Sequence, residues 1–271
     1  MQYGNASWGF RKTPLEEQLR ATASMGLRML ELGIANAPAD LPLNAGAEQL
    51  AQVHRLYDTY GVQLLCAATG NDFTIGSDAD VGKVKRVIDI CHVLGVRYLR
   101  IFAGFSPVDE VTGARWDTMI ACLRTVGAYA QNKVTLVVET HGGVKGYDDG
   151  VVHFHSVTTR AESLQKLLSE LPESIKVLYD PANLWAVGYQ NPAEILSVVG
   201  NRLAVVHLKD FRALPTGHLQ PAACGESKMD WAAQLRALQN FTGPALFEYE
   251  ITADVADGCK RCLDYLKRME N

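Results

Sequence analysis

The feature that most constrains the fold is an alternation of short apolar runs with amphipathic segments, repeated along the whole chain. Short apolar runs are typical of buried strands, and a recurrence of apolar residues every three or four positions is typical of helices. The predicted strands are Gln2–Ala6, Met29–Ile34, Gln63–Ala68, Tyr98–Ala103, Thr135–Thr140, Lys176–Asp180, Ala204–Lys209 and Ala245–Tyr249. The predicted helices are Leu15–Met25, Ala47–Tyr60, Asp80–Leu94, Trp116–Asn132, Thr159–Leu171, Pro192–Val199, Trp231–Gln239 and Ala253–Met269.

Eight successive strand–helix pairs favour a parallel sheet that closes into a barrel over a doubly wound open sheet. Gly61 and Gly95 each follow the end of a predicted helix, where glycine most easily takes the left-handed conformation. The length of 271 residues suits one such barrel, and no linker or shift in composition divides the chain. We therefore predict an α/β fold, a single-domain (β/α)8 TIM barrel over residues 1–271.

Charge and hydropathy argue against several classes of partner. A formal net charge of -4, with no basic tract, disfavours nucleic acid and anionic lipid. No apolar run reaches the roughly 20 residues that span a bilayer. The first residues lack the basic start and apolar run of a secretory signal, which favours a cytoplasmic protein with reduced cysteines. A small-molecule partner is expected, and association into a homo-oligomer stays open.

Cys259 and Cys262 form a C-x-x-C pair inside the last predicted helix. Since no second such pair lies nearby, two helical cysteines, at least one of them packed, are favoured over a zinc or redox site.

Charged side chains end four of the predicted strands in the second half of the chain. A buried parallel strand is normally apolar throughout, and the carboxyl ends of barrel strands form the catalytic face, where neighbouring strands converge. The runs are TLVVETH with Glu139 and His141, KVLYDPAN with Asp180 and Asn183, AVVHLKD with His207 and Lys209, and ALFEYE with Glu248 and Glu250.

Three carboxylates and one imidazole at such a mouth predict a site for one divalent metal ion. Oxygen-rich sites favour Mn²⁺ or Mg²⁺, whereas Co²⁺ and Zn²⁺ also accept carboxylate and imidazole ligands. Each residue alone has an ordinary alternative: Asp180 before Pro181 suits a turn or helix cap, and His207 suits a core histidine. Glu248 and Glu250 project to the same side of a strand, so alternation cannot choose between them.

Further polar and aromatic residues are candidates for contact with a substrate. Residues 142–158 are predicted to form a long loop over the mouth, in which His153 and His155 suit lid or substrate contacts better than a second metal. An alternative for Lys209 is a solvated ion pair with Asp210. The predicted substrate-binding residues are His141, Asn183, Lys209 and Arg100, and the loop aromatics Trp8 and Phe105 suit either a sugar ring or packing.

The runs IKVLYDPANLWAVGYQNPAEIL, NRLAVVHLKD, CGESKMDW and GPALFEYE together resemble the xylose-isomerase-like TIM-barrel family, over almost the whole chain. The resemblance places Glu139, Asp180, His207 and Glu248 on the metal-ligand positions of the family. It also chooses Glu248 over Glu250, and it makes Glu139 and Glu248 the acid/base pair. Asn183 and Lys145 stand where ketose 3-epimerases of the family carry a histidine and a glutamate, which argues against that particular activity.

The resemblance implies a metal-dependent isomerase or epimerase of a small sugar, sugar phosphate or related polyol ketone. In that chemistry glutamates move a carbon-bound proton through an enediolate that the metal stabilises. The alternative is a metal-dependent dehydratase of a cyclic polyol or dehydroshikimate-like substrate. A repair nuclease of the same architecture is disfavoured by the charge of -4 and by Asn183.

Overall fold

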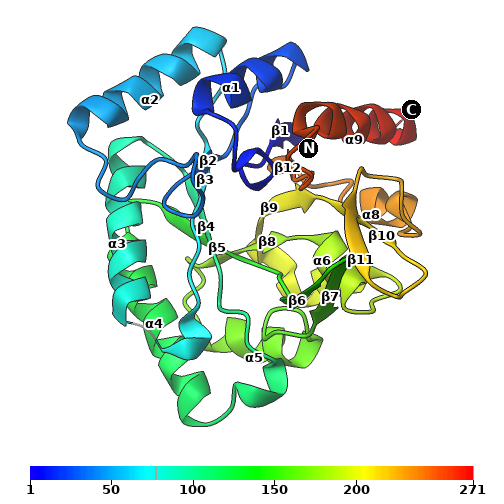
Figure 1. Cartoon of the computed structure of the whole chain (residues 1–271). Coiled ribbons are helices and arrows are strands. Elements are labelled where there is room, and N and C mark those ends of the chain that lie inside the picture. Colours follow the sequence, from blue (N-terminus) through cyan, green and yellow to red (C-terminus); the bar gives the residue numbers. More distant parts are fainter. Residues whose placement is uncertain (77, 271) are drawn as a thin grey trace.

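The protein is described here by a computed structural model that covers residues 1–76 and 78–270. Over these residues, eight strands form one parallel sheet in the order β1-β12-β9-β8-β5-β4-β3-β2 (Figure 1). The strands are β1 (Gln2–Asn5), β2 (Leu32–Gly33), β3 (Cys66–Ala68), β4 (Tyr98–Ile101), β5 (Thr135–Glu139), β8 (Lys176–Tyr179), β9 (Leu203–Leu208) and β12 (Pro244–Phe247). Each one falls within or next to a predicted strand, so the predicted TIM barrel is confirmed.

The two ends of this sheet meet through Asn5, the last residue of β1. Its backbone N–H donates to the carbonyl of Met29 at 3.0 Å, and its carbonyl accepts from the N–H of Glu31 at 2.9 Å. An isolated parallel bridge between Asn5 and Leu30 marks the same contact. Because β1 thereby joins the extended segment that leads into β2, the sheet closes on itself.

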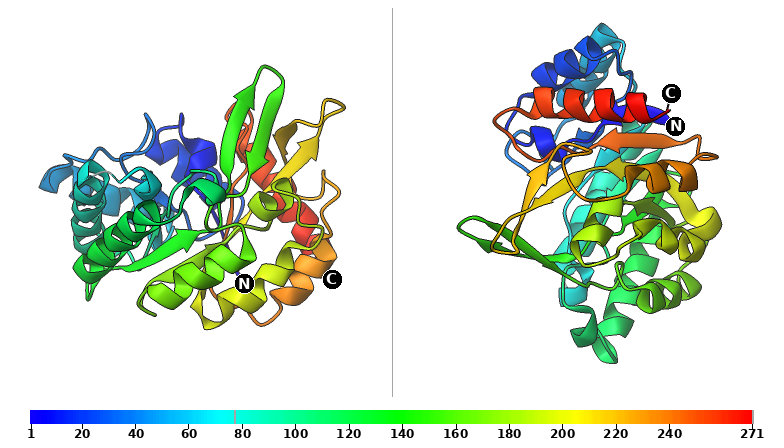
Figure 2. Two further views of the ribbon diagram at one scale, coloured as in Figure 1. Left: turned by 90° about the horizontal axis from the view of Figure 1, so that it is seen from below. Right: turned by 90° about the vertical axis from the view of Figure 1, so that its right-hand side faces the viewer.

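Helices lie outside the strands (Figures 1 and 2). In α3, Val84, Val87, Ile88 and Cys91 are buried, at the spacing of one helical face against the sheet. Gly61 ends α2 at a φ of 62°, which confirms the predicted left-handed cap. The α-helices are α1 (Leu15–Ser24), α2 (Ala47–Tyr60), α3 (Asp78–Val93), α4 (Ala114–Ala130), α5 (Ala161–Glu170), α6 (Pro181–Ala186), α7 (Leu196–Val199), α8 (Trp231–Ala237) and α9 (Val255–Glu270). Short 3₁₀ turns occupy Trp8–Phe10, Phe73–Ile75, Val108–Glu110, Pro192–Ile195 and Gly200–Arg202.

A second, antiparallel sheet stands beside the barrel and is called here the capping sheet. It consists of β10 (Asp210–Ala213), β11 (Leu219–Ala222), β7 (Gly150–Phe154) and β6 (Gly143–Tyr147), in that order. Figure 2 shows the β6–β7 hairpin projecting from the barrel. The prediction of a long loop over residues 142–158 was therefore wrong, because most of this segment forms β6 and β7, and β10 and β11 were not predicted.

The β6–β7 hairpin is favoured by its local sequence, although its strands do not show a regular alternation of apolar and polar residues. Tyr147 pairs with Gly150, which leaves a two-residue turn, and β-hairpins favour turns of that length. A Cβ atom on Gly150 would lie 2.6 Å from the carbonyl oxygen of Leu219, so glycine permits the close approach of β7 to β11.

Cys259 and Cys262 lie in α9 with their side chains fully buried, which confirms the prediction of packed helical cysteines. No helix in the described part of the chain combines the length and the apolarity that crossing a membrane requires.

Candidate metal centre

The inside of the barrel is built in layers of side chains. Val137, Leu178, Val205 and Leu246, from β5, β8, β9 and β12, belong to one buried apolar cluster together with Met29. Side chains two positions apart on a strand project to the same side. The residues two positions further along the last four strands therefore also face the barrel interior, one layer nearer the carboxyl ends. Those residues are Glu139, Asp180, His207 and Glu248.

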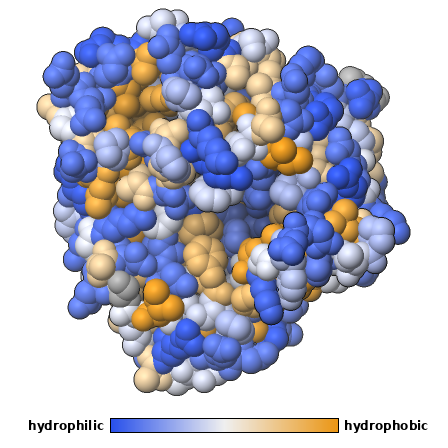
Figure 3. All heavy atoms as spheres, in the orientation of Figure 1, coloured by the Kyte–Doolittle hydropathy of each residue, from blue (hydrophilic) through white to orange (hydrophobic). Residues whose placement is uncertain are grey.

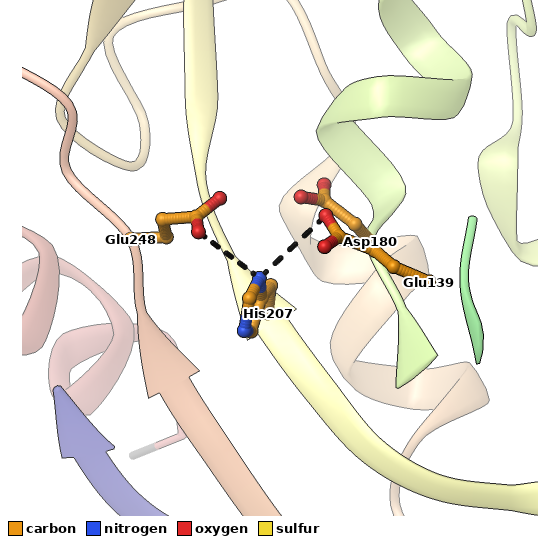
Figure 4. Close-up of side chains that lie close together, drawn as sticks. All are labelled: Glu139, Asp180, His207 and Glu248. Carbon is orange, nitrogen blue, oxygen red and sulfur yellow. Dashed lines mark ion pairs between the residues drawn. The ribbon is translucent and has the colours of Figure 1, made fainter. Parts of the chain in front are cut away.

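The structure brings these four predicted ligands together. One ligand atom from each lies within 4.8 Å of the others, and all four side chains are buried (Figure 4). Nδ1 of His207 lies 3.4 Å from Glu248 Oε1 and 3.8 Å from Glu139 Oε1. Glu250 lies outside this group, and its Oε1 accepts from Lys209 Nζ at 3.0 Å.

Asp180 is fixed by the start of a short helix that was not predicted. Its Oδ1 accepts from the backbone N–H groups of Ala182 and Asn183, at 2.8 and 3.1 Å, which makes it the N-cap of α6. Pro181 follows at the first helical position, where its missing N–H costs nothing. Asp180 can therefore cap α6 and still take part in a metal site, because Oδ1 accepts from the helix N–H groups while Oδ2 faces Asn183 and Lys209.

Asn183 and Arg100 orient the carboxylate of Glu139. The Asn183 amide donates to Glu139 Oε1 at 3.1 Å and to Asp180 Oδ2 at 3.1 Å, and Nε of Arg100 lies 3.3 Å from Glu139 Oε2. Asn183 is fully buried and is not among the residues that line the cavity, so its amide holds two ligands in place.

Lys209 is buried among carboxylates. Its Nζ lies 3.2 Å from Asp180 Oδ2, 2.9 Å from Glu248 Oε2 and 3.0 Å from Glu250 Oε1. The alternative of a solvated pair with Asp210 was wrong, because Asp210 accepts from Trp231 Nε1 and from the backbone N–H of Gly225.

Glu31, which the sequence analysis overlooked, lies behind His207. It is 1% exposed, and its Oε2 accepts from the N–H of Ser7 at 3.1 Å and from the Ser7 hydroxyl at 2.9 Å. Its Oε1 lies 3.8 Å from His207 Nε2, while neither ring nitrogen of His207 has a hydrogen-bond partner among the described residues. The signal was present in the sequence: Glu31 is a charge inside an apolar strand, two positions after the inward-facing Met29.

A cavity of about 430 Å³ opens beside this cluster, with Glu139 and Glu248 in its lining, and Figure 3 shows this face of the molecule hollowed near its centre. Its lining includes the predicted substrate-binding residues His141, Lys209 and Arg100 and the aromatic residues Trp8 and Phe105, and its roof, formed by the capping sheet, includes His153. His155 is not among the lining residues, and its Nδ1 lies 3.4 Å from the Thr159 hydroxyl.

Electrostatics favour a cation at this centre. Burial raises the pKa of the Glu139 carboxyl to about 7, against the opposing effects of His207 and Arg100. Burial also raises the pKa of Asp180, which Lys209 counteracts only in part. Burial alone would lower the pKa of His207, but the carboxylates of Glu248 and Glu31 outweigh it and raise that pKa.

The donor set fits a divalent metal ion. Three carboxylates and one imidazole suit an oxygen-preferring divalent cation, and His207 carries a buried nitrogen with no hydrogen-bond partner in the described structure, directed at two of the carboxylates. A bound cation would relieve the mutual repulsion of the carboxylates and supply the missing partner for that nitrogen.

Most of the chain matches a known protein family in sequence. A family model described as xylose isomerase-like TIM barrel matches residues 19–269. No curated protein matches the chain in sequence.

Several solved structures share the fold at low sequence identity. A probable 3-DHS dehydratase of petrobactin synthesis from Bacillus anthracis is 14% identical with a TM-score of 0.80, and the match covers 98% of this chain and 99% of that one. A 3-keto-D-glucoside 4-epimerase from E. coli is 15% identical with a TM-score of 0.74, covering 99% of both chains. A xylose isomerase domain protein from Planctomyces limnophilus is 18% identical with a TM-score of 0.74, covering 93% and 91%. At these identities the likeness establishes the fold alone.

Proposed function

This chain belongs to the xylose isomerase-like TIM-barrel family, and we propose that it is a divalent-metal-dependent isomerase or epimerase of a small sugar or related polyol ketone. The observation that supports the proposal most directly is the buried group of Glu139, Asp180, His207 and Glu248 at the edge of a cavity. The similarity in fold to a 3-keto-D-glucoside 4-epimerase is consistent with it.

In this proposal the four residues hold one cation, with Mn²⁺ or Mg²⁺ favoured by the excess of oxygen ligands. When bound, the ion supplies Lewis acidity toward a carbonyl or hydroxyl oxygen of the substrate. Glu139 and Glu248 lie on either side of His207 (Figure 4) and both line the cavity. One of them removes a proton from a carbon atom of the substrate, and the other returns a proton.

The remaining cavity residues bind the substrate. His141 stays neutral, because burial and the nearby Lys209 lower its pKa to about 3, so it contacts a hydroxyl as an uncharged hydrogen-bonding group. Lys209 keeps Glu248 ionised: burial alone would raise the pKa of Glu248, but Lys209 and His207 lower it well below its ordinary value.

A screen of small ketoses and inososes in D₂O with added Mn²⁺ tests the proposal. We expect incorporation of one solvent deuterium into a product of otherwise unchanged mass, and no reaction after chelation. A product lighter by one water would identify the dehydratase alternative instead. If the purified protein binds no divalent ion, the proposed function is wrong.

Metal affinity should depend strongly on pH. The pKa of Glu139 is raised by burial to about 7 in the metal-free protein, and the metal binds only the ionised carboxylate. Below about pH 7 the apparent Kd should therefore rise at least about tenfold per pH unit. Above that pH it should continue to fall, because His207, whose pKa is also raised, must lose its proton to bind the metal. Calorimetric titrations with Mn²⁺ between about pH 5 and pH 8.5 measure this, and a flat profile would contradict it.

The same shift predicts how the metal-free protein responds to pH. The pKa of Glu139 is higher in the folded chain than in the unfolded chain, so its contribution to stability is present below the unfolded pKa of 4.5 and is lost as the pH rises towards about 7. Bound metal should therefore raise the melting temperature more at pH 8 than at pH 6.

Replacing Glu31 with glutamine should weaken Mn²⁺ binding by about 10- to 100-fold, although Glu31 is not one of the four ligands. The Glu31 carboxylate lies 3.8 Å from Nε2 of His207, and a carboxylate behind a metal-bound histidine fixes the ring orientation and its tautomer. Ser7→Ala, which removes one of the hydrogen bonds to Glu31, should cause a smaller loss. An unchanged Kd in Glu31→Gln would show that Glu31 is only a buried structural residue.

A further inference from the structure

We infer that the cavity accepts an uncharged polyhydroxy carbonyl compound and discriminates against its phosphate ester. This inference rests on the proposed function, because it names the substrate class of the same site. It is drawn from the charges that line the cavity and from the chemistry of its roof.

The cations of the cavity are already neutralised by the protein. Among the described residues that line it, the permanently charged cations are Arg100 and Lys209. Lys209 lies within 3.2 Å of oxygens from three carboxylates, those of Asp180, Glu248 and Glu250. Arg100 pairs with Glu139 at 3.3 Å, donates to the carbonyl of Thr69 at 3.0 Å and lies over the ring of Phe102.

A bound metal ion would complete this balance without leaving a positive excess. Four carboxylates (Glu139, Asp180, Glu248 and Glu250), together with the buried Glu31 behind His207, face two side-chain cations, so a divalent ion leaves no positive excess. A phosphate ester carries about two negative charges at neutral pH. Such a ligand would meet no uncompensated cation here, whereas phosphate sites in proteins normally offer arginine, lysine or a helix N-terminus.

The roof of the cavity is apolar except at one position. The capping sheet contributes Val144, Val151, Phe211 and Pro221 to the lining, and His153 is the polar residue among them. Both ring nitrogens of His153 are buried without a hydrogen-bond partner in the described structure, and burial lowers its pKa to about 4. His153 is thus a neutral group available to a substrate hydroxyl, surrounded by surface that suits the C–H face of a sugar ring and not an ionised group.

Strand alternation keeps Lys145, next to a lining residue, out of the cavity. On β6, Val144 lines the cavity while its neighbour Lys145 is exposed, with its ammonium 5.3 Å from the centre of the Tyr147 ring. On β7 the same alternation directs Val151 and His153 into the cavity and leaves Val152 exposed.

Matched pairs of ligands test the inference on the Mn²⁺-loaded protein. The probes are D-ribulose and its 5-phosphate, D-xylulose and its 5-phosphate, and D-fructose and its 6-phosphate. By calorimetry, at least one uncharged sugar should bind at least about tenfold more tightly than its phosphate. Equal or tighter binding of the phosphates, or no binding of any uncharged member at tens of millimolar, would overturn the inference.

Two valine variants on one strand make the test specific to the roof. Val151→Lys places a cation in the cavity and should improve phosphate binding at least about tenfold relative to the uncharged partner. Val152→Lys adds the same charge on the exposed side of β7 and should leave the ratio unchanged. If a folded, metal-loaded Val151→Lys protein shows no gain for any phosphate, the charge argument fails. Deuterium exchange is scored separately, so charge selectivity without exchange would reject the proposed catalysis and leave the binding inference standing.

Discussion

Replacing Glu139 with glutamine should reduce solvent-deuterium exchange into the substrate by about 10² to 10⁴, while the protein stays folded and can still be loaded with Mn²⁺ at a higher metal concentration. Glutamine has nearly the shape of glutamate and keeps an oxygen that can accept from the Asn183 amide, as Glu139 does at 3.1 Å. It cannot take a proton from carbon. The loss should therefore appear in the exchange rate far more than in substrate binding.

The measurement compares deuterium incorporation by wild-type and variant protein, each saturated with Mn²⁺ as verified by metal analysis. Glu173→Gln, at an exposed position, makes the same chemical change away from the site and should exchange at the wild-type rate. Undiminished exchange in Glu139→Gln would remove Glu139 from the acid/base role.

Replacing Lys209 with methionine should lower the free energy of unfolding of the metal-free protein by about 3 kcal/mol. Lys209 is 2% exposed and pairs with three carboxylates, so its removal leaves negative charges buried without a partner. The carboxylates of Asp180 and Glu248 can escape this penalty by taking up protons. The loss should consequently be larger at pH 8 than at pH 5, and added Mn²⁺ should recover part of it at either pH.

Urea denaturation followed by circular dichroism, with and without chelator, measures these differences. Lys260→Met is the matched control, because Lys260 pairs with Asp264 on the surface of α9 and is 60% exposed. That variant should lose well under about 1 kcal/mol. A similarly small loss in Lys209→Met would mean that the buried ion pairs contribute little to stability.

The barrel and the convergence of Glu139, Asp180, His207 and Glu248 could be predicted because both depend on local patterns. Alternation of strands and helices determines the sheet, and a charge at the end of an apolar strand marks the mouth of the barrel. The choice of Glu248 over Glu250 depended on family resemblance, and the position of Glu248, but not Glu250, within the group of four close side chains agrees with it.

The features that were not predicted, which are the capping sheet, α6 and the position of Glu31, also have physical causes. The joining of the two hairpins into the capping sheet was missed because β7 reaches β11 through a pairing of Leu219 with Val151, a long-range contact that no local pattern encodes. The β6–β7 hairpin itself has a local signal, the two-residue turn between Tyr147 and Gly150. The helix α6 is only six residues long, too short to show periodicity, although Asp180-Pro181 carries its start signal. Glu31 could not be found from charges at strand ends, because it lies inside an apolar segment and reaches His207 only through the inward direction that it shares with Met29.

The barrel sheet and the capping sheet contribute different parts of the site, which has a consequence for how such proteins can evolve. All four ligand-type residues lie at the ends of barrel strands, whereas the roof of the cavity belongs to two hairpins inserted after β5 and after β9. Mutation can therefore remodel the hairpins without disturbing the ligands, and a lineage can change the compound it accepts while keeping one reaction. These two hairpins are therefore the segments to exchange between related barrels when substrate specificity is to be transferred in the laboratory.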